Sequence, residues 1–292
     1  MLDLLVVILN YYTRDLLRDC LQSLRQQAGL QFVACVVDNA SPDGSADMVA
    51  AEFPEVVLVR NPRNTGYSAG NNLALRQYGF PHQPQARYAM LLNPDTIVPE
   101  NALAQMVRFA DQHPDIGIVG PKLLLEDGTL DKACRRSFPT PEVSFYRLLG
   151  LSKLFPHSPR FGRYNMTFLD IDAQADIDAV VGACMLLRSE ATAKVGLLDE
   201  QFFMYGEDLD WCLRIKQAGY RVVYYPSVTV HHIKRAASRT SKKAHYEFQR
   251  AMWLFYKKHY QGQTSRPVDV LVKLGLVLRG GRPLLQEIWA RR

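Results

Sequence analysis

The N-terminal third of the chain alternates between short apolar runs and amphipathic segments. The apolar runs are rich in β-branched residues and have the length of buried parallel strands; they cover residues 4–9, 32–37, 56–60 and 89–92. Between them apolar residues recur at helical spacing, which predicts helices over residues 15–26, 45–52 and from after Gly70 to Tyr78, and another starting near Pro99. This alternation predicts an α/β fold with a mostly parallel central sheet.

Beyond Gly120 the pattern is less regular. Asp127-Gly128 predicts a hairpin over residues 121–130. Further strands are predicted at 177–188, with a glycine break, at 221–225, closed by Pro226, and at 228–230. Further helices are predicted at 189–195, at 209–218, ended by Gly219, and at 244–260. Residues 137–176 are rich in aromatics, proline and arginine, and we interpret them as a flexible lid or a substrate-binding insertion that shapes an acceptor site.

Polar residues follow each of the four N-terminal strands, and these are Asn10-Tyr11, Asp38-Asn39, residues 61–64 and Asn93-Pro94-Asp95. Because ligands of parallel sheets bind beyond the carboxyl ends of the strands, we expect these loops to converge on one crevice. Asn93 and Asp95 offer the amide and carboxylate oxygens that suit Mg²⁺ or Mn²⁺. The alternative is an Asn-Pro turn in which Asp95 caps the next segment.

Two of these loops allow a ligand-binding and a structural interpretation. Asp38 can accept hydrogen bonds from the base or ribose of a nucleotide, or it can close an Asx-turn. The segment from Asn64 through Gly66 to Asn72 resembles a phosphate-approach loop that leads into a helix, because its glycines allow close contact with the backbone. It is not a Walker motif, since GxxxxGK[ST] is absent.

The densest carboxylate cluster is Glu207-Asp208 with Asp210, at the start of a predicted helix. Acids there complement the helix dipole, but one of them can also act as a general base towards a hydroxyl. His231 and His232 follow a predicted strand and point to opposite faces of it, so only one can serve a site. That histidine either completes a metal shell with Asp95 or is structural.

Charge and cysteine content narrow the class of protein. The net charge is +6, but residues 231–292 carry 14 Lys/Arg and 3 Asp/Glu, so the basic excess lies at the C-terminus. That region can meet nucleic acid, anionic lipid or a phosphate-bearing substrate, or it can be a solvated surface.

Five dispersed cysteines without CxxC spacing indicate reduced thiols in the cytoplasm and disfavour zinc. No uncharged apolar stretch of the length of a membrane span occurs, and the N-terminus is interpreted as a strand rather than a signal peptide.

Taken together, the motifs resemble the inverting nucleotide-sugar glycosyltransferases of family 2, which have the GT-A fold, and most of all the rhamnosyltransferase-like branch. The resemblance covers about residues 3–260 and rests on VVILNYYTRDLLRDCLQSL, VVDNASPDGS, NTGYSAGNN, LLNPDT, VVGACMLLRSEA, FFMYGEDLDWCLRIKQAGY and HHIKRAAS. It implies a Rossmann-like GT-A domain over residues 1–262, followed by a basic amphipathic helical extension over residues 263–292.

The resemblance also implies roles for residues. Asp95 stands at the second acid of the family's metal-binding DXD motif, and Asn93 replaces the first acid, which leaves one charge fewer on the cation. Asp208 matches the general base, with Glu207 beside it. His232 resembles the late metal-binding histidine, judged by its distance to Lys234, Arg235 and Ser238, with His231 as the alternative. The implied nucleotide-binding residues are Asn10, Tyr11, Asp38, Asn64, Gly66, Asn72 and Asn93.

By the same resemblance, the chain is expected to use Mg²⁺ or Mn²⁺ and to move a sugar, best L-rhamnose from dTDP-rhamnose, to a glycan or polyprenyl-diphosphate-linked acceptor in cell-surface polysaccharide synthesis. We expect it in the cytoplasm, at the inner face of the membrane if residues 265–292 form an interfacial helix; the alternative is a helix packed on the catalytic domain or in a dimer. A UDP-hexose transferase and a non-catalytic nucleotide-sugar-binding protein remain alternatives. No motif favours nucleic-acid binding or the Gly-rich loop of nucleotidyltransferases. The sugar, the nucleotide, the acceptor and the oligomeric state stay open.

Overall fold

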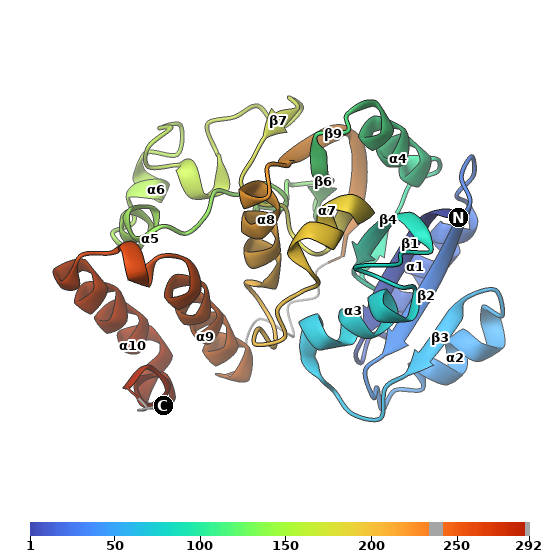
Figure 1. Ribbon diagram of the computed structural model, residues 1–292, viewed down its shortest axis with the longest axis horizontal. Helices are drawn as coiled ribbons and strands as arrows, with labels where there is room; N and C mark the ends of the chain where they lie inside the picture. The colour runs from blue at the N-terminus through green and yellow to red at the C-terminus, as the bar shows by residue number, and fades with distance from the viewer. Residues whose placement is uncertain (234–241, 290–292) are drawn as a thin grey trace.

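A central sheet of nine strands organises the described part of the chain, residues 1–233 and 242–289 of a computed structural model (Figure 1). The strand order is β3-β2-β1-β4-β8-β6-β9-β5, and β7 also pairs with β9. The strands are β1 Leu2–Asn10, β2 Phe32–Asp38, β3 Val57–Arg60, β4 Ala86–Leu92, β5 Thr96–Ile97, β6 Ile116–Leu124, β7 Ala175–Asp176, β8 Cys184–Arg188 and β9 Arg221–His232. Lys234, Arg235 and Ser238, which were used to choose between the two histidines, lie outside the described residues.

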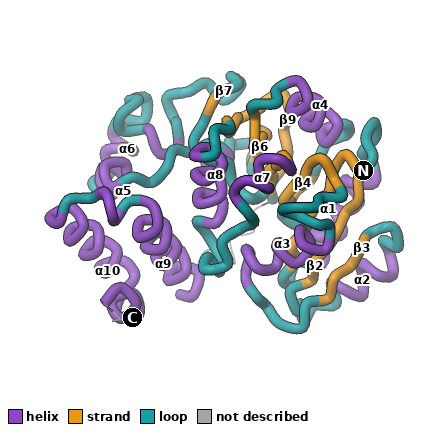
Figure 2. Tube along the Cα trace, viewed as in Figure 1, coloured by secondary structure: helices purple, strands orange, loops and turns teal. Residues whose placement is uncertain are grey.

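Helices cover the sheet and form a separate layer at the C-terminal end (Figure 2). They are α1 Arg14–Arg25, α2 Ser45–Glu52, α3 Gly66–Gln77, α4 Ala102–Gln112, α5 Pro141–Leu148, α6 Leu151–Leu154, α7 Ser189–Val195, α8 Glu207–Gln217, α9 Lys242–His259 and α10 Arg266–Trp289. Short 3-10 turns are η1 Lys132–Cys134, η2 Arg163–Asn165 and η4 Gln261–Gln263. The predicted α/β class is confirmed.

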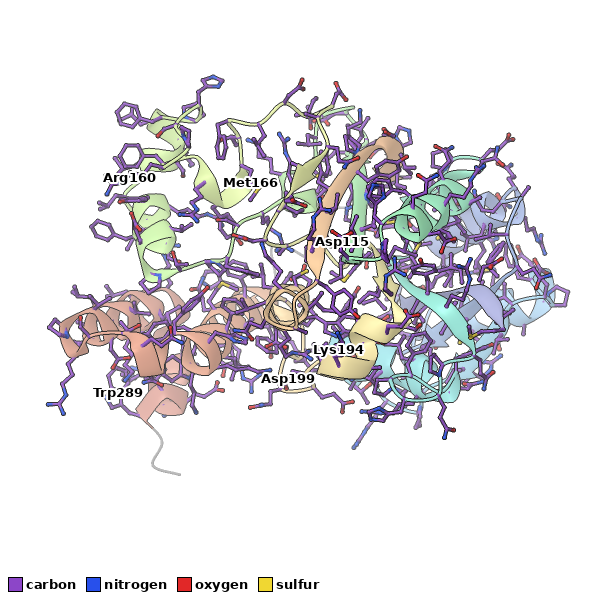
Figure 3. All side chains as sticks on the ribbon, turned by 45° about the horizontal axis from the view of Figure 1, so that its top comes forward. Asp115, Arg160, Met166, Lys194, Asp199 and Trp289 are labelled. Carbon is purple, nitrogen blue, oxygen red and sulfur yellow. The ribbon has the colours of Figure 1, made fainter. Side chains whose placement is uncertain are left out.

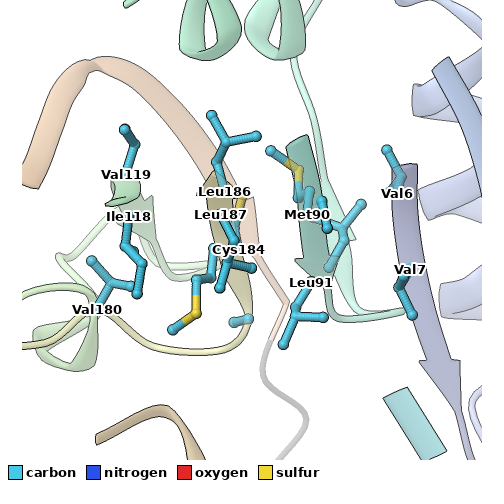
Figure 4. Close-up of a cluster of buried hydrophobic side chains, with 14 of the residues drawn as sticks. Val6, Val7, Met90, Leu91, Ile118, Val119, Val180, Cys184, Leu186 and Leu187 are labelled. Atoms are coloured by element: carbon cyan, nitrogen blue, oxygen red, sulfur yellow. The ribbon is translucent and has the colours of Figure 1, made fainter. Parts of the chain in front are cut away.

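The four N-terminal strands are parallel, so their carboxyl ends share one edge of the sheet. Asn10 stands opposite Asp38, and Asp38 stands opposite Arg60 in the next strand. Strand β1 is apolar on both faces because helices cover both, and Leu4 to Ile8 are fully buried. Strand β8 runs antiparallel between β4 and β6 and continues the core, as the side chains of Met90, Leu186 and Ile118 show (Figure 4).

Several element boundaries differ from the prediction. Helix α3 begins at Gly66 rather than after Gly70, so the predicted loop is largely the first turn of a helix. Strand β6 begins at Ile116, ahead of the predicted hairpin, although the turn at Gly128 and the Leu124–Leu130 bridge are present. Strand β9 continues through Pro226, where the pairing with β6 skips from Tyr225 to Thr229; a proline is tolerated at such a break because no ladder hydrogen bond is lost.

The predicted strand over residues 177–188 is regular only from Cys184 onwards. Residues 137–176, for which no element was predicted, contain the short helices α5 and α6 and strand β7. The hydrogen bonds from the buried Arg135 guanidinium to the carbonyls of Leu169 and Asp170 fix the end of this insertion to the core. Its role as a lid stays a prediction.

Helix α10 packs on α9 through one face. Leu284 forms a small core with Trp253 and Tyr256, and Arg250 pairs with Glu287 at 3.0 Å. Gly281, with φ of 70°, kinks the helix ahead of Pro283. None of the described helices has the length and apolar character needed to cross a bilayer. The predicted division of the chain at residue 262 stays a prediction.

Candidate active site

A cavity of about 800 Å³ opens beyond the carboxyl ends of β1 and β4, a volume typical of small-molecule sites. Elements far apart in the sequence form its wall: the loops after the N-terminal strands, the segment around η1 and η2, the start of α8 and one side of α9. The predicted site residues that line it are Tyr11, Asn64, Gly66, Asn93, Asp95, Glu207, Asp208 and His232. Asn10, Asp38, Asn72 and His231 do not line it.

Asn10 and Asp38 form the buried floor beside this cavity. The Asn10 amide donates to Asp38 Oδ1 at 2.9 Å and to the hydroxyl of Ser41. Asp38 Oδ2 accepts from the backbone N–H of Ser41, which closes the Asx-turn allowed by the sequence. A carboxylate has about four acceptor positions, so Asp38 retains capacity for a ligand. Tyr11, with 51% of its surface exposed, extends from this loop beside the cavity.

Asn39, which the sequence reasoning did not select, organises the next loop. Its buried amide donates to Asn64 and accepts from Asn61 and from the backbone of Thr65. Asn64 in turn accepts from the backbone N–H of Gly66, the first residue of α3. Gly66 has φ of 84°, and a Cβ there would lie 2.5 Å from the carbonyl oxygen of Phe203, so only glycine fits. This network fixes the N-terminus of α3 at the cavity, where helix dipoles favour anions.

Asn72, which was predicted to bind the nucleotide, lies on α3 and does not line the cavity. Its amide donates to Leu198 O and Glu200, and its oxygen accepts from the Leu198 N–H, so it ties α3 to residues 198–200. Its contact with a nucleotide stays a prediction. His231 is exposed, and it lies on the face of β9 opposite to that of His232 because side chains alternate along a strand.

Asp95 and His232 meet at the cavity, and their role as a metal pair stays a prediction. Thr96 pairs with His232 in the short β5–β9 ladder, and this brings Asp95 Oδ1 to 3.2 Å from His232 Nε2. His232 Nδ1 lies 3.0 Å from the carboxylate of Asp131, a residue that the sequence reasoning missed. When Nδ1–H donates to Asp131, the lone pair of Nε2 faces Asp95. Of the two histidines, His232 therefore has the geometry of a ligand.

This donor set fits a hard divalent cation bound together with a ligand's phosphate oxygens. One carboxylate and one imidazole converge, the imidazole is oriented by a second carboxylate, and the side chain of Asn93 lies on the same wall. Among residues 1–233 and 242–289, no group of three or more His, Cys, Asp or Glu side chains could hold a metal alone. Mg²⁺ usually takes only one or two carboxylates from the protein, with phosphates and water completing its shell.

Glu207 and Asp208 begin α8 at the opposite wall, and their environments differ. Asp208 Oδ2 accepts from the buried guanidinium of Arg136 at 2.6 Å and from the backbone N–H of Gly182 at 3.2 Å. Arg136 also donates to the carbonyl of Val180. Burial opposes the charge of Arg136, yet Asp208 more than compensates, so the pKa of Arg136 is raised. Asp208 therefore lies against a buried cation.

Glu207, by contrast, is buried without such a partner. Its Oε2 atom has no hydrogen-bond partner among the residues that the structure describes. Burial, together with the negative charge of Asp208, raises the pKa of Glu207 to about 8. The two adjacent carboxyl groups thus have different surroundings, one against a buried guanidinium and one without a cation, and such a difference in surroundings separates acid and base roles in enzymes.

The third acid of this cluster faces away from the cavity. Asp210 is fully buried and contacts Arg214, Lys258 and His259, the last two on α9. Although burial alone would raise its pKa, the hydrogen bond from His259 and the charges of Arg214 and Lys258 lower it to about 2. Asp210 therefore anchors α9, whose residues Ala244, Phe248 and Met252 line the cavity.

The loop that enters α8 is held tightly to α3. Tyr205 and Gly206 both have positive φ, 70° and 80°, and the Tyr67 N–H donates to Phe203 O at 2.6 Å. A tyrosine at positive φ is a strained conformation of the kind that clusters at functional sites. Arg136 was not selected from the sequence; the two consecutive arginines Arg135-Arg136 carry no apolar periodicity, and the structure shows that both are buried.

The chain is similar in sequence to known proteins. The family model described as "Glycosyltransferase like family 2" matches residues 3–255. The chain is 26% identical over 280 residues to an N-acetylglucosaminyl-diphospho-decaprenol L-rhamnosyltransferase of Mycobacterium tuberculosis, covering 94% of this chain and 90% of the relative. It is 28% identical over 179 residues to the rhamnosyltransferase WbbL of Escherichia coli K12, covering 60% of this chain and 63% of that protein.

A solved structure shares the fold. It is a mannosyltransferase from Pyrobaculum calidifontis in complex with GDP-Man and Mn²⁺, with a TM-score of 0.58 and 16% identity. The match covers 99% of this chain and 81% of the other.

Proposed function

This chain belongs to glycosyltransferase family 2 and has the GT-A fold, and on that premise we propose that it transfers L-rhamnose from dTDP-rhamnose to a hydroxyl of a lipid-linked glycan during cell-surface polysaccharide synthesis. The observation that carries the proposal is the convergence of Asp95 and His232 with Glu207 and Asp208 on one cavity. The names of the relatives support rhamnose and a polyprenyl-linked acceptor. A UDP-hexose donor is the alternative within the same fold.

Donor binding follows from the loops at the carboxyl edge of the sheet. We propose that Tyr11 and the loop that begins at Asn10 pack on the base, and that Asp38, held by the Asn10 amide, accepts a hydrogen bond at its edge. Asn64 and Gly66 then lie along the ribose and diphosphate. Asp95 and His232, with Asn93 beside them, would hold Mg²⁺ or Mn²⁺, which neutralises charge on a leaving diphosphate.

Transfer itself is assigned to the pair at the start of α8. Asp208, held in place by Arg136, removes a proton from the acceptor hydroxyl as that oxygen attacks the anomeric carbon from the face opposite the diphosphate. One such displacement inverts the anomeric centre. Glu207, protonated near neutral pH because burial raises its pKa to about 8, donates a hydrogen bond to a sugar oxygen. A non-catalytic binding protein would not need this pair.

Calorimetry tests the donor. The chain is titrated with dTDP-rhamnose, UDP-glucose, UDP-galactose, UDP-N-acetylglucosamine and GDP-mannose, each with Mg²⁺, with Mn²⁺ and with EDTA. We expect dTDP-rhamnose to bind only with metal. Metal-dependent binding of a UDP-sugar instead would replace the rhamnose assignment, and metal-independent binding would contradict the role of Asp95. A folded sample that binds none of the five contradicts the proposed donor class.

Asp131 provides a sharper test of the metal site. Replacing Asp131 by Asn removes the carboxylate that orients His232, and second-sphere changes of this kind typically lower metal affinity by roughly 10–100-fold. Mn²⁺ is titrated in the presence of dTDP and followed by calorimetry. Asp127→Asn is the matched control, because Asp127 lies on the preceding turn and, within residues 1–233 and 242–289, accepts side-chain hydrogen bonds from Thr129 alone. Equal Mn²⁺ affinity of D131N and D127N would remove Asp131 from the site.

The proposed place of action is the cytoplasm, at the inner face of the membrane, because a polyprenyl-linked acceptor stays in the bilayer. The partners are then the nucleotide-sugar donor, the lipid-linked glycan and the membrane surface.

A further inference from the structure

Large apolar side chains are exposed mainly at one end of the molecule. Of the seventeen exposed large hydrophobic side chains among the described residues, five lie between residues 145 and 155 and seven lie on α10. Helices α5, α6 and α10 occupy the same end, opposite α2 and β3 (Figure 1). The turned view agrees, with the labelled Arg160 and Trp289 on the same side of the molecule (Figure 3).

Helix α10 is apolar on two opposite faces. Val272, Leu276 and Leu284 pack towards α9. On the other face the side chains one and two turns apart, Leu271, Leu274 and Leu278, are 66%, 48% and 85% exposed. A helix on the surface of a globular protein normally has a single apolar stripe, so the second stripe indicates an apolar partner.

The second exposed stretch adjoins the cavity. Phe145, Leu148 and Leu149 are 55%, 49% and 57% exposed at the end of α5, and Leu154 is 69% exposed on α6. Arg147, on the same helix, lines the cavity, as does Tyr164 of η2. The apolar surface therefore borders the mouth of the candidate active site.

Both stretches belong to segments with an excess of basic residues. Residues 141–165 carry Arg147, Lys153, Arg160 and Arg163 against the single acid Glu142. Helix α10 carries four basic residues, Arg266, Lys273, Arg279 and Arg282, against Asp269 and Glu287. A symmetric dimer through this end would bring like charges together, because a two-fold interface places the same patch on both sides. The phosphates of anionic lipids are complementary to it.

We propose that this end, formed by residues 145–155 and the outer face of α10, lies in the headgroup region of an anionic bilayer. The apolar side chains enter the boundary of the acyl chains, and the surrounding arginines and lysines contact lipid phosphates. A polyprenyl-linked acceptor can then remain in the membrane while its sugar enters the cavity past Arg147. That last step rests on the proposed function, whereas the membrane contact does not.

Vesicle flotation with the full chain tests the surface. We expect wild-type protein to float with vesicles of phosphatidylcholine and phosphatidylglycerol, and to float less with phosphatidylcholine alone. The variants L271D/L278D and L149D/L154D should each lower partitioning by roughly tenfold or more. Ile171→Asp is the matched control, an exposed apolar residue outside both stretches. These positions are chosen over truncation of α10, which would uncover Trp253.

Three results would overturn the proposal: wild-type protein that floats with neither vesicle, double variants that float as well as wild type, or control and double variants that lose binding equally. Sedimentation velocity tests whether a second copy of the chain, rather than a membrane, covers this end. Concentration-dependent dimers that both double variants abolish, without vesicle binding, would make this end an interface between copies. Calorimetry on the same samples measures the affinity for dTDP and UDP, and so tests the nucleotide site independently of vesicle binding. Vesicle binding without nucleotide binding would contradict the proposed function and leave the membrane surface standing.

Discussion

Asp208→Asn is expected to lower the turnover number by about 10²–10⁴-fold while the nucleotide-sugar still binds, because the substitution removes a positioned base and leaves the donor loops unchanged. Turnover is measured by release of the nucleoside diphosphate, and donor affinity by calorimetry. Weaker donor binding with normal turnover would show that Asp208 has no part in proton transfer.

The substitution also leaves the buried Arg136 without its carboxylate, and an unpaired buried charge destabilises by roughly 3–5 kcal/mol. The double variant D208N/R136Q removes this charge and serves as the folding control. If the double variant is as stable as wild type and still inactive, loss of the base rather than unfolding explains the loss. Restored turnover in the double variant would contradict the assignment of the base.

Glu207→Gln is expected to make the protein more stable at pH 8 and to change its stability little at pH 5. The pKa of Glu207 rises from 4.5 to about 8 on folding, because of burial and of the charge of Asp208. Between these values the folded protein keeps the proton that the unfolded chain has lost. The free energy of unfolding of the wild type therefore falls as pH rises through this window, by on the order of a few kcal/mol.

Glutamine carries no such proton, so the stability difference between E207Q and wild type should grow from pH 5 to pH 8. Thermal unfolding measures it, at about 2 °C per kcal/mol for a chain of this size. Glu190→Gln, at an exposed position on α7, is the control with no pH-dependent difference. A constant difference at all pH values would show that Glu207 is ionised in the folded protein.

The same variant separates the two acids in catalysis. Gln can still donate a hydrogen bond, so E207Q should retain most of its turnover at pH 7, in contrast to D208N. If E207Q loses as much activity as D208N, the base is Glu207 and the carboxylate of Asp208 orients it.

The sequence was sufficient where local pattern determines structure. Apolar runs located β1, β2 and β4, and the polar residues after them do meet, because parallel strands end at one edge of the sheet. Because side chains alternate along a strand, the sequence predicted that only one of His231 and His232 faces the site. The pairing of β5 with β9, which the sequence did not predict, places His232 beside Asp95. The start of α3 at Gly66 was missed because Asn39, 27 residues earlier, satisfies and fixes that loop through Asn64.

Long-range partners could not be predicted. Arg136 is 72 residues from Asp208, and Asp131 is 101 residues from His232. No periodicity connects such positions, and each residue taken alone has the character of an ordinary surface charge. The strand end predicted at Pro226 was wrong. A proline usually ends a strand, but β9 continues past Pro226 because its pairing with β6 is irregular there.

Residues 131–136, which include η1, limit how the substrate preference of this enzyme can change. Asp131 contacts His232, and Arg136, five residues later, contacts Asp208. In the proposed mechanism one short stretch of backbone therefore sets the spacing between the leaving group and the base. A shift of this stretch would misalign both substrates at once, so changes of sugar or acceptor preference should accumulate in residues 141–165 and leave residues 131–136 unaltered.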